Sequence, residues 1–337
     1  MTHDFRHIDL QPYNSFGVRA VADRLAAFGS EDELRELLLN GEILAGRWDV
    51  LGKGNNILFT QDYRGTLIHP TGTGIEVLSS DAQRVRIRVQ AGLEWDDLVA
   101  WAVGEGLWGV ENLSLIPGSV GAAPVQNIGA YGAEAGEVID AVEMLAVESL
   151  VPITLAGAHC AFGYRDSVFK RQMKDRAIIT AVIFSLGRQP KPRLGYGDLK
   201  QETEAQGDPS LKNIRRAVID IRRRKLPDPA TLGNAGSFFK NPVVPHETAE
   251  RLVRQYPDMP LYPGAADSTK LAAGWLIDRA GWKGFRRGDA GVHDAQALVL
   301  VNFGGASGRE ILQLSDDIRA DVQHKFGVPL DTEVNIW

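Results

Sequence analysis

Residues 109–136 read GVENLSLIPGSVGAAPVQNIGAYGAEAG, and this stretch constrains the fold more than any other part of the chain. It is rich in glycine, alanine and proline but also carries apolar residues of the buried type, whereas a flexible linker would be polar and monotonous. Small side chains let the backbone approach another surface closely. Two interpretations remain open: a tightly packed strand and turn, or a wall for a flat ligand, to which Gln126, Asn127 and Tyr131 would add polar contacts.

A glycine-rich turn, LGKGNN at residues 51–56, lies between two strand-like runs. Successive glycines let backbone N–H groups point into one concavity that suits a pyrophosphate, although the same pattern is typical of a plain hairpin turn. GKGNNI supplies only the first half of a dinucleotide-binding fingerprint and precedes a strand instead of a helix, and no P-loop is present. The sequence therefore argues against a Rossmann domain and a P-loop nucleotidase.

The bulk composition is that of a globular protein, with 337 residues, 44% hydrophobic and 24% charged, which is enough for two or three domains. A net charge of -6 does not favour binding to nucleic acid, which attracts basic surfaces. No secretory signal or membrane span is expected from the sequence. Cys160 is the only cysteine, and the histidines never take a metal-ligand spacing, so neither disulfide nor metal is expected. These features predict a soluble cytoplasmic enzyme. We expect it to be a monomer that acts on a small-molecule substrate.

Helix and strand patterns are clear in several places. Residues 30–41 and 307–327 each open with a capping box and end at a glycine. Residues 211–225 carry apolar residues at helical spacing, and residues 84–90 alternate strictly between apolar residues and arginine or glutamine, as a half-buried strand does. The polar stretch 201–210 is the expected domain boundary.

Two segments beyond residue 160 offer ligand-binding side chains. In FGYRDSVFK, Arg165 follows Tyr164 and could clamp a carboxylate in a bidentate fork, although an ion pair with the adjacent Asp166 is an equal alternative. Tyr196 stands between glycines on what should be a mobile loop, and such a ring could close over a ligand.

A basic run at residues 222–225 ends just before two prolines. We interpret Arg222 to Arg224 as solvated cations at a helix end, whereas Lys225 could be aimed at a phosphate because the prolines fix the chain direction there. Ser237, in GNAGSFFKNP, stands either on a tight turn that enters a buried strand or on a braced turn that presents a catalytic hydroxyl.

These motifs together resemble one family. LGKGNNILFT, ENLSLIPGSVGAAPVQNIGAYGAE, FGYRDSVFK, YGDL, KLPDP, GNAGSFFKNP, KLAAGWLID, VHDAQALVLVN and the terminal TEV are similar, in order and spacing, to the UDP-N-acetylenolpyruvoylglucosamine reductases. The likeness runs from residue 14 to residue 333, and the YGDL loop resembles the type I branch of that family.

The resemblance implies an α+β fold in three domains. Residues 1–70 and 71–208 would form a two-part FAD-binding module of the vanillyl-alcohol oxidase or PCMH-like type, and residues 209–337 would form an α+β domain that binds a UDP-sugar. The C-terminal strand is expected to return to the first domain.

The resemblance also assigns residues to roles. The cofactor-binding set expected for FAD is Gly52, Gly54, Asn55, Asn56, Ile116, Pro117, Gly118, Gly121, Asn127 and Gly129. The catalytic set is Arg165, Ser237 and Glu333. The substrate-binding set is Tyr164, Tyr196, Lys225, Asn241 and Gln296.

The reaction implied is the NADPH-dependent reduction of UDP-N-acetylglucosamine enolpyruvate to UDP-N-acetylmuramate, a step of peptidoglycan precursor synthesis. NADPH would reduce FAD, flavin N5 would pass the hydride to the β-carbon of the alkene, and Ser237 would protonate the α-carbon. Arg165 would offset charge on the substrate carboxylate, and Glu333 would help to polarise that group.

Two alternatives are kept. One is another FAD-dependent oxidoreductase with the same FAD-binding architecture and a different small substrate, which would lack the domain that contains GNAGSFF and TEV. The other is a redox-inactive sugar-nucleotide binding protein, which would contain no flavin and would not be yellow.

Overall fold

The computed structural model describes residues 3–264 and 267–337, and the chain divides into two compact units. Unit 1 comprises Met1–Ile8, Ala22–Lys53 and Arg64–Arg223. Unit 2 comprises Asp9–Val21, Gly54–Tyr63 and Arg224–Trp337. Two short N-terminal segments therefore belong with the C-terminal third of the chain, and the boundary within the second half falls inside a helix.

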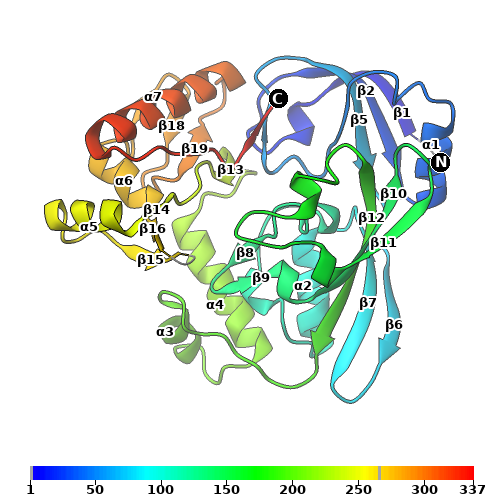
Figure 1. Ribbon diagram of the computed structural model, residues 1–337, viewed down its shortest axis with the longest axis horizontal. Coiled ribbons are helices and arrows are strands. Elements are labelled where there is room, and N and C mark those ends of the chain that lie inside the picture. The colour runs from blue at the N-terminus through cyan, green and yellow to red at the C-terminus, as the bar shows by residue number, and fades with distance from the viewer. Residues whose placement is uncertain (1–2, 265–266) are drawn as a thin grey trace. The chain divides into compact units, whose positions relative to one another are not determined.

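A five-stranded antiparallel sheet in the order β11-β10-β12-β7-β6 belongs to unit 1 (Figure 1). Its strands are β6 (Ile75–Ser80), β7 (Arg84–Gln90), β10 (Ile139–Ala146), β11 (Pro152–Ala156) and β12 (Ala177–Gly187). The alternation expected for residues 84–90 is confirmed, because Val85, Ile87 and Val89 are all buried while the arginines between them are not. One face of this sheet therefore supplies a hydrophobic core.

Two helices pack their apolar faces into the same core. They are α2 (Trp95–Gly104) and α4 (Leu211–Lys225), whose predicted apolar positions Leu211, Ile214, Val218 and Ile221 are buried with the residues of β7 and β12. The polar stretch before α4 contains a short helix, α3 (Leu199–Glu204).

A second sheet of unit 1 has the order β1-β2-β5-β3, with β1 (His3–Asp9), β2 (Val21–Phe28), β3 (Trp48–Val50) and β5 (Tyr63–Pro70). Helix α1 (Glu31–Leu39) buries Leu34 and Leu38 in a core shared with strands β2, β5, β10 and β12. The expected capping box is half formed: Ser30 accepts the N–H of Glu33, but the Glu33 carboxylate accepts the N–H of Gly29 instead of that of Ser30.

The hairpin interpretation of LGKGNN is wrong. Strand β3 pairs in parallel with β5, and β4 (Ile57–Leu58) pairs in parallel with β20 (Asn335–Ile336). The turn therefore connects strands of two different sheets, and each strand finds its partner elsewhere in the chain.

Unit 2 contains a sheet in the order β13-β19-β18-β17, formed by β13 (Gly233–Ser237), β17 (Arg286–Arg287), β18 (Ala290–Val292) and β19 (Val299–Asn302). A three-stranded sheet adds β14 (Val243–Pro245), β15 (Leu261–Pro263) and β16 (Ser268–Leu271), and the helices are α5 (His246–Gln255), α6 (Ala273–Ala280) and α7 (Gly308–Phe326). The capping box of α7 and its end at Gly327 are confirmed, since Gly327 has a φ of 70°.

The 109–136 stretch folds into short elements: the 3-10 turns Glu111–Leu113, Val120–Ala122 and Ala135–Glu137 and the two-stranded ladder of β8 (Gly129–Ala130) with β9 (Ala133–Glu134). Further 3-10 turns are Gln11–Tyr13, Gly157–His159 and Val168–Lys170. Among the residues described, no helix has both the length and the apolar composition that crossing a membrane requires.

Candidate functional site

The turn at residues 52–55 presents a run of unbonded backbone N–H groups. None of these four groups donates a hydrogen bond to a residue within 3–264 or 267–337. Gly54 has a φ of 67°, and a side chain there would overlap the carbonyl oxygen of Tyr13, so the position requires glycine. The turn therefore keeps the properties of an anion-binding nest.

The 109–136 stretch meets this turn at Ser119. A Cβ atom on Gly52 would lie 2.8 Å from Ser119 Oγ, so the two backbones approach closely. Ser119 is 3% exposed, and its hydroxyl has no hydrogen-bond partner in the described part of the chain. The N–H groups of Ile116 and Gly118 are likewise unbonded there. A buried hydroxyl and free N–H groups against a glycine turn fit the phosphates of a dinucleotide cofactor, and Ser119 joins the candidate set.

The side chain of Asn127 forms hydrogen bonds to three other residues of unit 1. Its amide nitrogen donates to Glu134 (2.7 Å) and to the carbonyl of Gly163 (3.1 Å), while its side-chain oxygen accepts the N–H of Gly136 (2.8 Å). At 1% exposure it holds the loop around the predicted cofactor residues, and its own cofactor contact stays a prediction.

Arg165 lies beside the predicted cofactor segment. Its Nη2 donates to the carbonyl of Gly129 (3.0 Å), and its guanidinium carbon is 5.5 Å from the ring centre of Tyr164. The neighbouring Asp166 forms an ion pair with Arg171 (3.4 Å). A cation next to the predicted ligand wall suits a carboxylate clamp.

Tyr196 also meets this wall. Its ring packs edge-on against Tyr131, with ring centres 6.0 Å apart, and the residue remains 49% exposed. Asn112 fixes both flanking segments, since its amide nitrogen donates to the carbonyls of Tyr131 and Arg193 (2.8 Å each). The structure thus brings the predicted cofactor stretch, Arg165 and the Tyr196 loop together within unit 1.

The backbone segment that follows Ser237 pairs with the segment that carries Glu333 in unit 2. The N–H of Glu333 donates to the carbonyl of Phe238 (2.8 Å), and Phe239 forms an isolated antiparallel bridge with Thr332. Phe238 and Phe239 are buried (0% and 1% exposed), so the segment directly after Ser237 is anchored. The Ser237 hydroxyl, by contrast, bonds to no residue in 3–264 or 267–337 and is available to a ligand.

The terminal strand also reaches the glycine turn. Asn56 Nδ2 donates to the carbonyl of Glu333 (3.2 Å), and the carbonyl of Asn56 accepts the N–H of Asn335 (3.0 Å). One end of the predicted cofactor turn is therefore next to a predicted catalytic residue.

Asn241 and Gln296 gather at the N-terminus of α6. Asn241 Oδ1 accepts the N–H of Ala273 (3.0 Å), and a Cβ on Gly274 would lie 3.2 Å from Gln296 Oε1. The amide nitrogen of Asn241 donates to no residue within the described ranges. Amide donors at a helix N-terminus favour an anionic ligand. Lys225 is exposed at the end of α4.

The interpretation of Arg222 as a solvated cation is wrong. Arg222 Nε donates to the carbonyl of Leu115 (3.1 Å), and burial lowers the pKa of Arg222, although Tyr131 and Asp96 oppose that shift. The sequence contained a signal for this, because residue 222 lies four positions after Val218 and so continues the apolar face of the helix.

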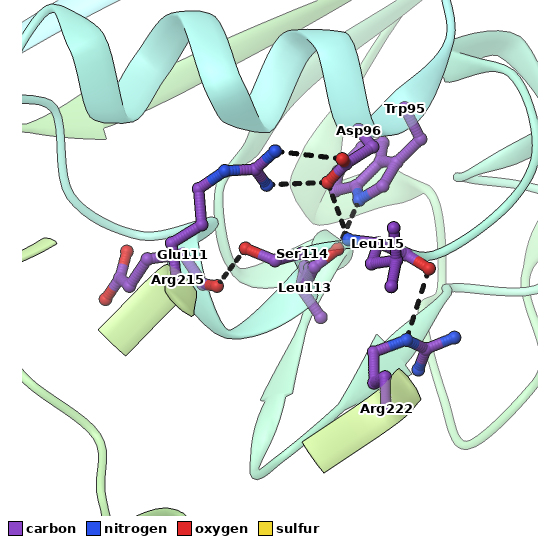
Figure 2. Close-up of polar contacts among 8 residues, drawn as sticks. All are labelled: Trp95, Asp96, Glu111, Leu113, Ser114, Leu115, Arg215 and Arg222. Carbon is purple, nitrogen blue, oxygen red and sulfur yellow. Dashed lines mark hydrogen bonds and ion pairs between the residues drawn. The ribbon is translucent and has the colours of Figure 1, made fainter. Parts of the chain in front are cut away.

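Asp96 accepts two hydrogen bonds from Arg215 (2.6 and 2.9 Å) and one from the N–H of Leu115 (2.5 Å), as Figure 2 shows. Burial raises the pKa of Asp96, but the hydrogen bonds from Arg215 and Leu115 and the charges of Arg215 and Arg222 outweigh it, so the pKa lies below its ordinary value. The folded state therefore favours the ionised form of the Asp96 carboxyl group.

This shift gives a pH-dependent stability. We expect the difference in unfolding free energy between wild type and Asp96→Ala to have its largest value above about pH 4, which is the ordinary pKa of an aspartate in the unfolded chain. Because the folded pKa is depressed, the difference should shrink as pH falls through that lower value. Urea unfolding of both proteins from about pH 7 to about pH 3 would measure it. A gap that stays constant over this range would contradict the assignment.

Comparisons with known proteins identify the class first. The FAD binding domain family matches residues 22–149, and the C-terminal domain of UDP-N-acetylenolpyruvoylglucosamine reductase matches residues 228–337. The chain is thus a FAD-dependent oxidoreductase, and the predicted α+β fold with a FAD-binding module and a separate C-terminal domain is confirmed.

Full-length relatives then give the family. The chain is 47% identical to the UDP-N-acetylenolpyruvoylglucosamine reductase of Chromobacterium violaceum over 99% of both chains, and 45% identical to that of Pseudomonas aeruginosa over 98% of both. The chain belongs to the UDP-N-acetylenolpyruvoylglucosamine reductase family.

Solved structures show the same fold. The reductase of Thermus caldophilus matches with a TM-score of 0.68 at 24% identity, covering 100% of this chain and 99% of that one. A solvent-stable cholesterol oxidase matches with a TM-score of 0.52 at 10% identity, covering 98% of this chain and 87% of that one.

Proposed function

We propose that this protein reduces UDP-N-acetylglucosamine enolpyruvate to UDP-N-acetylmuramate with NADPH as the hydride donor and FAD as the bound cofactor. The family membership supports this activity, and the C-terminal match to residues 228–337 argues against another FAD-dependent oxidoreductase with a different small substrate. The structural observation that carries the proposal is the Ser237 hydroxyl, which has no partner among the described residues. Ser237 directly precedes the buried rings of Phe238 and Phe239, and the carbonyl of Phe238 accepts the N–H of Glu333.

The residues fit FAD. The N–H groups of residues 52–55, the buried Ser119 hydroxyl and the N–H groups of Ile116 and Gly118 would hold the phosphates. When bound, FAD supplies the hydride chemistry, accepting a hydride from NADPH and passing it to the alkene. The remaining tasks belong to this chain's own side chains.

Arg165 would bind the carboxylate of the enolpyruvyl group. Charge on that carboxylate grows as a hydride adds to the β-carbon, and a fixed guanidinium stabilises this charge more than it stabilises the ground state. The hydrogen bond to Gly129 and the contact with Tyr164 hold the guanidinium in place.

Ser237 would donate its proton to the α-carbon, and Glu333 would polarise the carboxylate or enol beside it. A hydroxyl is a weak acid, but the α-carbon of an enolate is a strong base, so position matters more than pKa. The buried rings of Phe238 and Phe239 support that position.

The nucleotide would be held by Lys225, Asn241, Gln296 and Tyr196, with Tyr164 ordering the enolpyruvyl end. The amides at the N-terminus of α6 supply hydrogen-bond donors for an anion, and Lys225 adds a positive charge. The exposed ring of Tyr196 is suited to cover the sugar nucleotide. We further propose that the enzyme acts in the cytoplasm as a monomer, and the three-domain division stays a prediction.

Lys225→Ala should raise the KM for the enolpyruvyl substrate by about 10- to 100-fold, the range of one charge-assisted hydrogen bond, with little change in flavin content. Steady-state kinetics and the flavin absorbance of the purified protein measure the two effects. Arg223→Ala, which removes an exposed cation two residues earlier on the same helix, is the matched control and should behave like wild type. A flavin-free Lys225→Ala protein would show that Lys225 belongs to the cofactor site.

The activity itself has a direct test. Under anaerobic conditions, NADPH should bleach the flavin absorbance of the purified protein, and added UDP-N-acetylglucosamine enolpyruvate should restore it. Failure of the substrate to restore the absorbance would refute the proposed function.

A further inference from the structure

Leu115 holds an unusual backbone conformation next to the predicted cofactor residues. Its φ is 58°, in the left-handed region that a residue with a branched side chain rarely adopts. The residues that follow it are Ile116, Pro117 and Gly118. A relaxed Leu115 would redirect this segment.

Both polar groups of the Leu115 residue are held by charged side chains. Its N–H donates to Asp96 of α2 (2.5 Å), and its carbonyl accepts from Arg222 of α4 (3.1 Å). Arg215, two turns earlier on α4, donates twice to Asp96 (2.6 and 2.9 Å). Figure 2 shows Asp96 bonded both to Arg215 and to the N–H of Leu115, and Arg222 bonded to the carbonyl of Leu115.

The ends of the turn are fixed from α2 as well. The indole nitrogen of Trp95 donates to the carbonyl of Leu113 (2.9 Å), and the backbone N–H of Trp95 donates to the carbonyl of Gly118 (2.9 Å). With these acceptors and both groups of Leu115 engaged, the N–H groups of Ile116 and Gly118 remain unbonded in residues 3–264 and 267–337. The network thus leaves free donors where a ligand is expected.

A partly buried ion pair is a poor source of stability. The side chains of Arg215 and Asp96 are 17% and 27% exposed, and the desolvation of such pairs often cancels their attraction. Their better-attested use is to specify one conformation among several.

We propose that Asp96, Arg215 and Arg222 are positioning residues for the cofactor, which lock Leu115 in its left-handed conformation and so direct the N–H groups of Ile116 and Gly118 toward FAD. The proposal rests on the proposed function for the identity of the ligand. The three residues would therefore affect the affinity for flavin and the environment of the bound flavin indirectly, by holding the turn at Leu115.

The test compares Asp96→Ala with Glu143→Ala. Glu143 pairs with Arg88 (2.7 Å) in the sheet of unit 1, with side chains 22% and 28% exposed, so its loss leaves a similar arginine unpaired away from the turn. FAD is titrated into flavin-free protein and followed by quenching of flavin fluorescence, and the visible circular dichroism of the bound flavin is recorded. We expect the Kd for FAD to rise about tenfold or more in Asp96→Ala, with an altered dichroism band, and to stay within about twofold in Glu143→Ala.

Leu115→Gly supplies the rescue. Glycine adopts a positive φ without strain, and Leu115 is only partly buried, so little packing is lost. Asp96→Ala/Leu115→Gly should recover much of the lost affinity and the wild-type dichroism, which a loss of general stability would not do. Arg215→Gln, which keeps the carboxylate, should show a smaller loss of the same kind and serves if Asp96→Ala does not fold.

Two results would overturn the proposal. One is a wild-type Kd and dichroism in both Asp96→Ala and Arg215→Gln, and the other is a loss of affinity that Leu115→Gly does not reduce. Failure of the wild-type protein to bind FAD would instead refute the proposed function, so the two failures are distinguishable.

Discussion

Ser237→Ala should leave the bleaching of the flavin by NADPH at its wild-type rate and slow the recovery of absorbance by the enolpyruvyl substrate about 10²- to 10⁴-fold. This range is the usual contribution of a positioned general acid. The hydroxyl has no partner among the described residues, so its loss unpairs no protein group and should cost little stability. Anaerobic stopped-flow absorbance measures the two halves of the reaction separately.

Ser315→Ala is the matched control for that variant. Ser315 is fully buried in α7 of the same unit, and its hydroxyl also lacks a partner in the described chain. The same atom is removed in both variants, but only Ser237 directly precedes the residue, Phe238, whose carbonyl accepts the N–H of Glu333. Recovery at the wild-type rate in Ser237→Ala would remove Ser237 from the proton-donor role and would leave Glu333 as the next candidate.

Local patterns predicted the helices and the buried strands well. The apolar spacing of residues 211–225 and the capping box at Ser307 depend on neighbours within a few positions, and both appear in the structure as expected. The LGKGNN turn failed as a hairpin because strand pairing is not local: β4 pairs with β20, at the other end of the chain.

The candidate site was predictable only in part, for a similar reason. The local pattern left a catalytic hydroxyl at Ser237 as one of two alternatives, and only the resemblance suggested Glu333. No spacing rule predicts that the carbonyl of Phe238 accepts the N–H of Glu333. The hydroxyl of Ser119 became a candidate only when its burial and its lack of a partner were known. The prediction for Arg222 was wrong because it considered the charge of the side chain and ignored the position of the residue on the apolar face of α4. In the structure the guanidinium donates to the Leu115 carbonyl.

Arg165→Met should lower kcat/KM for the enolpyruvyl substrate by about 10²- to 10³-fold, the usual loss when one preorganised charge or donor is removed from a reacting carboxylate or oxyanion. Methionine keeps the length and apolar stem of the side chain but loses the donors to Gly129 and to the substrate. NADPH-dependent bleaching should be unchanged. Stopped-flow and steady-state kinetics together separate the two effects.

The division of the loss between kcat and KM tests the role more closely. If Arg165 stabilises charge that develops as the alkene is reduced, kcat must fall, whereas a simple anchor would raise KM alone. Arg165→Lys should recover only part of the activity, because an ammonium group keeps the charge but cannot form the bidentate fork. Arg171→Met, which removes an exposed arginine paired with Asp166 on the same segment, should leave both constants near wild type. An Arg165→Met enzyme with unchanged kcat would reduce Arg165 from a catalytic to a substrate-binding residue.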